Sequence, residues 1–144
     1  WHHDVEEIMK HHAMMVGSDG SSLANYGPLG RGKPHPRNYG TFPRFLGKYV
    51  LKEKIVSLED GVRRMTSFPA LRFRLEGRGL LKAGSYADVT VVDPKTLIDN
   101  ADFQDPHQYC DGIEYVLVNG TVALEGGEYN GALAGRTLRH PGGI

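Results

Sequence analysis

Cysteine is almost absent from this sequence, which contains only Cys110 among its 144 residues. A single cysteine cannot form an intrachain disulfide, so nothing in the sequence calls for an oxidising compartment. The sequence also lacks any apolar run approaching the roughly 18 residues that a membrane-spanning helix needs. We therefore expect a cytoplasmic protein with no membrane partner.

The sequence has no excess of charge, because 17 Lys and Arg residues balance 17 Asp and Glu residues. Global charge thus gives no reason to expect nucleic acid as a partner. Three catalytic signatures are missing as well: the G-x-S-x-G turn of serine hydrolases, a phosphate-binding glycine loop and a complete zinc motif. The paired histidines at 2–3 and 11–12 are adjacent on a helix, where neighbouring side chains diverge too far to share a metal ion.

The first part of the chain has the pattern of one helix followed by one strand. Spacing of Val5, Ile8 and Met9 predicts a helix over residues 4–12, and the apolar run 13–16 predicts a short buried strand. Residues 20–47 are rich in glycine and proline, which predicts a long loop of functional character. This order is one step of a layered α/β protein.

Two further helices are predicted after the loop. One covers residues 45–54, and the second begins at Ser57, where Ser57 and Asp60 resemble a capping box. Pro69 is expected to end or kink that second helix.

The remaining sequence has β character. A change of composition near residues 74–79 separates the two parts of the chain. Asn119-Gly120 is a strong signal for a β-hairpin. Strands are predicted over 87–93, 113–119 and 121–124.

The sharpest local feature is Ser18-Asp19-Gly20, which directly follows the predicted strand over 13–16. Residues at the carboxyl ends of parallel strands face the active site in α/β folds. A carboxylate there can bind a metal or take a proton from metal-bound water. Asp-Gly is also a common turn dipeptide, so the tripeptide alone leaves a plain turn open.

The predicted loop has an unusual charge pattern, with no Asp or Glu between Gly20 and Lys52. Arg37 lies in the loop within His35-Pro36-Arg37, and arginine is suited to holding a carboxylate with two hydrogen bonds. A solvated basic face would produce the same pattern. The basic residues are Arg31, Lys33, Arg37, Arg44, Lys48 and Lys52.

Several sequence blocks together resemble the C-terminal third of N-acyl-D-amino-acid deacylases, which are amidohydrolases. The most specific block is HPRNYGTFPR at residues 35–44, whereas ADVTVVDP and VNG are shared more broadly among amidohydrolases. The matching blocks cover residues 16–20, 27–50, 57–70, 77–94 and 112–120.

The resemblance implies an α/β fold class. Residues 1–76 would be the C-terminal end of a (β/α)8 barrel, and residues 77–144 part of a small β-sandwich. The implied activity is zinc-dependent hydrolysis of the amide bond of an N-acyl-D-amino acid. Asp19 would act as general base and acid beside the metal and as a ligand of a second metal ion. Arg37 would hold the substrate's α-carboxylate, with Ser18 as a further substrate contact.

The resemblance also implies that the histidine and cysteine ligands of zinc lie on earlier barrel strands, which this sequence does not contain. We therefore expect the chain alone to bind no catalytic zinc and to be inactive without the N-terminal portion of the barrel. Two other functions stay open: a cyclic amidase similar to dihydropyrimidinase, and a non-catalytic module that binds anions or contacts a subunit.

Overall fold

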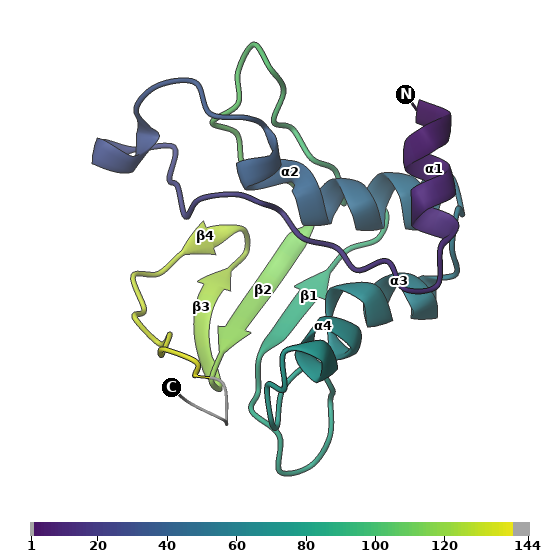
Figure 1. Cartoon of the computed structure of the whole chain (residues 1–144). Helices are drawn as coiled ribbons and strands as arrows, with labels where there is room; N and C mark the ends of the chain where they lie inside the picture. Colours follow the sequence, from purple (N-terminus) through teal and green to yellow (C-terminus); the bar gives the residue numbers. More distant parts are fainter. Residues whose placement is uncertain (1, 140–144) are drawn as a thin grey trace.

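Helix α1 (His2–Lys10) begins the described part of a computed structural model, which covers residues 2–139 (Figure 1). Asp4 lies in its first turn and Lys10 in its last, which suits the helix dipole. The Lys10 ammonium also forms an exposed ion pair with Glu7 at 2.7 Å. The helix predicted over 4–12 is confirmed, although it ends two residues earlier, at Lys10.

The strand predicted over residues 13–16 is not present. A strand needs a neighbouring strand for its backbone hydrogen bonds, and none of the described strands lies beside this segment. Its backbone bonds are instead made with helical segments, as when the Val16 N–H donates to the Arg64 carbonyl at 3.2 Å. Met14 and Val16 are half-buried and pack on the hydrophobic core.

The loop predicted over residues 20–47 is wrong for its last part. A short 3-10 helix, η1 (Gly27–Gly30), interrupts the loop, and helix α2 (Arg37–Arg44) continues directly into the π-helix η2 (Phe45–Lys52). Gly40 and Pro43 have low helix propensity, so the sequence pattern does not predict a helix at α2. Both are buried in the structure, so tertiary packing outweighs local propensity here.

The helix predicted from Ser57 is confirmed as α3 (Leu58–Met65). The Ser57 hydroxyl accepts the backbone N–H of Asp60 at 3.2 Å, which is the predicted N-cap. Helix α4 (Ser67–Arg72) follows after a short break. Pro69 lies in the first turn of α4, where the missing N–H has no helical partner to lose.

The described core is small and lies among α1, η2 and α3. Its buried apolar side chains are Met9, Phe45, Tyr49 and Val50. Helix α3 approaches η2 closely at Gly61, where an added Cβ would lie only 2.7 Å from a methyl carbon of Val50.

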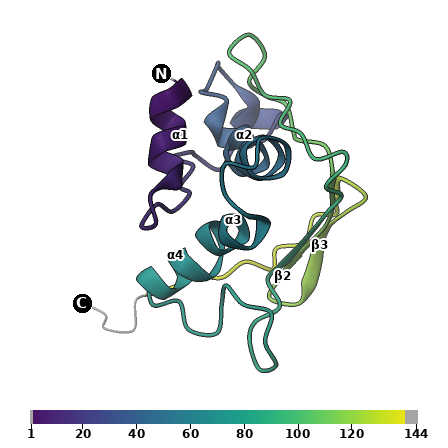
Figure 2. The same ribbon diagram turned by 90° about the vertical axis from the view of Figure 1, so that its right-hand side faces the viewer.

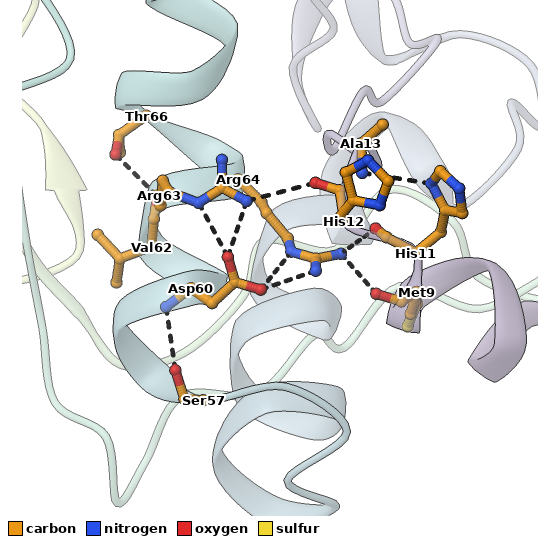
Figure 3. A network of polar contacts seen from close by, with 10 residues as sticks. All are labelled: Met9, His11, His12, Ala13, Ser57, Asp60, Val62, Arg63, Arg64 and Thr66. Atoms are coloured by element: carbon orange, nitrogen blue, oxygen red, sulfur yellow. Dashed lines mark hydrogen bonds and ion pairs between the residues drawn. The ribbon is translucent and has the colours of Figure 1, made fainter.

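A buried arginine ties α1 to α3 (Figure 3). The Arg64 side chain is 3% exposed and forms an ion pair with Asp60 at 2.7 Å. Its guanidinium also donates to the carbonyls of Met9 and His11, at the C-terminal end of α1. The described hydrogen bonds of this cation thus all go to negatively charged or partly negative oxygens, as a buried charge requires.

The β part is one antiparallel sheet with the order β1-β2-β3-β4. The predicted hairpin is confirmed: Asn119 (φ 50°) and Gly120 (φ 84°) adopt the left-handed backbone of a tight turn. A final short strand was not predicted. The strands are β1 (Val89–Val92), β2 (Ile113–Val118), β3 (Thr121–Glu125) and β4 (Glu128–Tyr129).

Helices α3 and α4 lie on one side of this sheet (Figure 2). Between α2, α3 and β1 there is an apolar cavity of about 610 Å³, lined in part by Phe42, Met65 and Val89. All strand pairs in residues 2–139 are antiparallel, so the expected mixture of helices and strands is present but the expected barrel strand is not. No helix among the described residues is long and apolar enough to cross a membrane.

Replacing the buried cation is expected to destabilise the protein strongly. Arg64→Met should lower the free energy of unfolding by about 3–5 kcal/mol, because it removes a buried cation and leaves one oxygen of Asp60 and two backbone carbonyls without their donor, while Arg63 keeps the other oxygen of Asp60. Urea unfolding followed by circular dichroism measures this change. Arg63→Met is the matched control, since Arg63 contacts the same carboxylate but is 40% exposed. Equal losses from the two variants would contradict the role given to burial.

The same ion pair should make stability depend on pH. The hydrogen bond from Arg64 holds the pKa of Asp60 below its ordinary value of 3.8. The resulting stabilisation is complete above the unfolded pKa and is lost as pH falls through the lower folded pKa. The stability gap between the wild type and Asp60→Asn should therefore shrink below about pH 3.8. A gap that stays constant down to pH 2 would contradict this assignment.

Candidate functional site

The structure brings together two of the three predicted site residues, Asp19 and Arg37. A carboxylate oxygen of Asp19 lies 2.9 Å from an Nη atom of Arg37. The Asp19 side chain is 85% exposed and that of Arg37 is 44% exposed, so a small ligand can reach both. The pair joins the end of the segment after α1 to the first residue of α2.

Asp19 has an unusual backbone conformation, with φ 49°. Few residues other than glycine adopt this left-handed region, and surrounding contacts must hold them there. Ser18, the third predicted residue, supplies one such contact, because its hydroxyl accepts the Gly20 N–H at 3.2 Å. In this structure Ser18 therefore shapes the turn that carries Asp19.

Arg37 is positioned by the residues that precede it. Pro36 is buried at the start of α2, and the Nδ1 atom of His35 accepts the Arg37 backbone N–H at 3.0 Å. The His35 ring packs edge-on against Phe103 at 5.0 Å. The guanidinium is thus carried by the first residue of α2, and among residues 2–139 its ion-pair partner is Asp19.

Asn38 belongs to this site but was not predicted from the sequence. Its side-chain oxygen accepts the Ser21 N–H at 2.6 Å, and its amide nitrogen donates to the His35 carbonyl at 2.7 Å. The bond between Ser21 and Asn38 joins residues 17 positions apart, so no local sequence pattern predicts it. Its only sequence signal is its place directly after Arg37 in the 35–44 block.

The loop before α2 is anchored by His107, which also contacts Tyr39 on α2. His107 Nε2 lies 3.1 Å from the Gly32 carbonyl, and Nδ1 lies 2.8 Å from the Tyr39 hydroxyl. Since a carbonyl only accepts, Nε2 carries the proton in the neutral ring and Nδ1 accepts from Tyr39. Burial raises the pKa of Tyr39, which keeps its hydroxyl protonated as that donor.

Some basic residues of the stretch between Gly20 and Lys52 are neutralised by acidic residues from elsewhere in the chain. Arg44 forms an ion pair at 2.6 Å with Asp99, whose side chain is only 10% exposed. Lys48 lies 3.8 Å from Glu53. Arg31 and Lys33 are exposed, and neither forms an ion pair with another of residues 2–139. The positive charge near Arg37 is therefore concentrated in the loop that precedes it.

The described residues do not form a metal site on their own. Nowhere in residues 2–139 do three His, Cys, Asp or Glu side chains gather closely enough to hold an ion. Cys110 is half-buried, and burial raises the pKa of its thiol, which disfavours the thiolate that binds metals. Asp19 alone offers at most one ligand.

Comparison with known proteins agrees with the resemblance. A model described as "Amidohydrolase family" matches residues 2–124. A D-aminoacylase of Alcaligenes xylosoxydans xylosoxydans is 42% identical over 94% of this chain, but the match covers 26% of that protein. The chain thus spans about a quarter of the length of this curated relative.

Solved structures give the same result. A D-aminoacylase studied for the role of its binuclear metal centre superposes on 92% of this chain and 27% of its own, with a TM-score of 0.83 and 40% identity. The N-acyl-D-glutamate deacylase of Bordetella bronchiseptica, complexed with zinc and a phosphonate inhibitor, covers 84% of this chain and 24% of its own, with a TM-score of 0.75 and 42% identity. The resemblance to N-acyl-D-amino-acid deacylases is confirmed.

Proposed function

The chain belongs to the amidohydrolase family, and from this premise we propose that the intact protein hydrolyses the amide bond of N-acyl-D-amino acids. The products would be a carboxylate and a D-amino acid. The observation that carries the proposal is the contact of 2.9 Å between Asp19 and Arg37, two groups of opposite charge held on different segments and open to solvent. The relatives named above support the substrate class.

Arg37 would bind the α-carboxylate of the substrate. An arginine has five N–H donors in a planar fork, and the contact with Asp19 is made through an Nη atom. The remaining donors are available to a second carboxylate without breaking the ion pair. Because α2 fixes the base of the side chain, the substrate would be oriented as well as bound.

Asp19 would move the proton. Its carboxylate accepts a proton from the attacking water and then gives it to the nitrogen of the leaving amine, so that water is added across the amide bond. Its contact with Arg37 would place this carboxylate next to the substrate's own anchor point. Ser18 would contribute as a further substrate contact and through its hydrogen bond to Gly20.

The metal ligands would come mainly from outside this chain. One solved relative contains zinc, and another has a binuclear metal centre. Among residues 2–139, Asp19 has no cluster of three possible ligands around it. We therefore propose that zinc is held by the N-terminal portion of the barrel, with Asp19 as a ligand of a second ion. Residues 1–76 would complete that barrel and residues 77–144 a β-sandwich, and this chain alone would be inactive.

Removing the proton-transfer group should affect turnover. In the intact protein, Asp19→Asn should lower kcat by about 10²–10⁴-fold, because the amide cannot accept the proton, while KM changes little. Steady-state hydrolysis of N-acetyl-D-methionine, followed by release of the free amine, measures both constants. Asp105→Asn is a matched control on an exposed loop. A fully active Asp19→Asn enzyme would overturn the proposed role.

Removing the carboxylate anchor should affect binding. Arg37→Met should raise KM about 10–100-fold for an N-acyl-D-amino acid, since hydrogen bonds to a charged group contribute about 1.5–3 kcal/mol. A substrate whose α-carboxylate is replaced by a carboxamide reports the cause. The wild type should discriminate strongly between the two substrates, and Arg37→Met should not.

Arg72→Met is the control for this substitution, because Arg72 is an exposed arginine on α4 away from Asp19. It should leave the discrimination unchanged. If Arg37→Met keeps the wild-type preference for the carboxylate, Arg37 is not the anchor.

A further inference from the structure

We infer that Asn38 is a positioning residue for the proposed reaction and holds the turn that carries Asp19 against the start of α2. The inference rests on the proposed function of Asp19 and Arg37. It goes beyond that function because Asn38 would act through Asp19 and would itself touch neither the substrate nor the reacting atoms.

Both ends of the Asn38 amide are used. The oxygen accepts the Ser21 N–H at 2.6 Å, and the nitrogen donates to the His35 carbonyl at 2.7 Å. The side chain thus bridges the segment after Asp19 and the turn that leads into Arg37. Its backbone N–H also donates to His35 at 3.1 Å, which fixes Asn38 firmly to that turn.

The Asp19 turn lies directly on Asn38. A Cβ added to Gly20 would stand 3.1 Å from both Cα and Oδ1 of Asn38, tighter than ordinary van der Waals contact. Asp19 itself has φ 49°, a conformation that persists only when neighbouring contacts impose it. The contact from Ser18 is local to the turn, whereas the one from Asn38 links the turn to α2.

Asparagine fits this position because it accepts and donates at the same time. An aspartate at 38 would keep the acceptor for Ser21 but would bring a negative oxygen toward the His35 carbonyl. A leucine of similar size would provide neither bond. The series Asn, Asp and Leu therefore separates the bridging bond to Ser21 from the bond to His35.

Loss of the bridge should act on turnover more than on binding. Arg37 is the first residue of α2 and keeps its place without Asn38's side chain, so the carboxylate anchor remains. The Asp19 turn loses its attachment, and a displaced catalytic group can cost about 100-fold in rate. A KM effect as large as the kcat effect does not follow from this geometry.

The experiment combines kinetics with hydrogen exchange on the intact protein. Asn38→Leu should lower kcat for N-acetyl-D-methionine about 100-fold with KM within about threefold. Amide exchange in peptides covering residues 17–25 should become faster. Asn38→Asp should fall between Asn38→Leu and the wild type in both measurements. In an Asp19→Asn background, Asn38→Leu should cause no further loss of kcat, because the group it positions is gone.

Asn130→Leu is the matched control. Asn130 also uses both ends of its side chain, donating to the Val122 carbonyl and accepting from the Ala132 N–H, but in the sheet. It should leave kcat and the exchange of residues 17–25 unchanged. Unchanged exchange or unchanged kcat in Asn38→Leu would overturn the inference while leaving the proposed function intact. A fully active Asp19→Asn enzyme would overturn the proposed function and, with it, the inference.

Discussion

The arrangement of the site depends first on a buried cation. The Arg64 guanidinium donates hydrogen bonds to carbonyls at the C-terminal end of α1 and forms an ion pair with Asp60 on α3. The backbone of the same residue accepts the N–H of Val16, three positions before Asp19. One arginine thus sets both the packing of two helices and the starting point of the segment that carries the site carboxylate.

A second set of contacts acts at the other end of that segment. The turn around Asp19 is held near α2 by contacts with Ser18, Arg37 and Asn38. The loop before α2 is held by His107, which also contacts Tyr39. The segment is therefore held by α3 at Val16 and by α2 at Asp19 and Ser21. Groups held in this way need little reorganisation when a ligand arrives, which is what an active site requires of its charged residues.

Local signals explain what the sequence could predict. Helix α1, the Ser57 cap and the Asn119-Gly120 hairpin depend on residues that are neighbours in the chain. The charge pattern and the family resemblance singled out Asp19 and Arg37 as candidate site residues, and the structure brings the two together. Their roles remain predictions.

Long-range contacts explain what it could not predict. The segment 13–16 has the composition of a strand, but a strand forms only beside a partner, and none of the described strands provides one. Helix α2 contains Gly40 and Pro43, and its stability comes from packing against residues such as Asp99 rather than from propensity.

The backbone of Asp19 has a consequence for engineering. At φ 49° a glycine would sit with less strain, so a selection for thermostability alone should tend to discard the carboxylate. Stability and activity would then be in conflict at a single backbone angle.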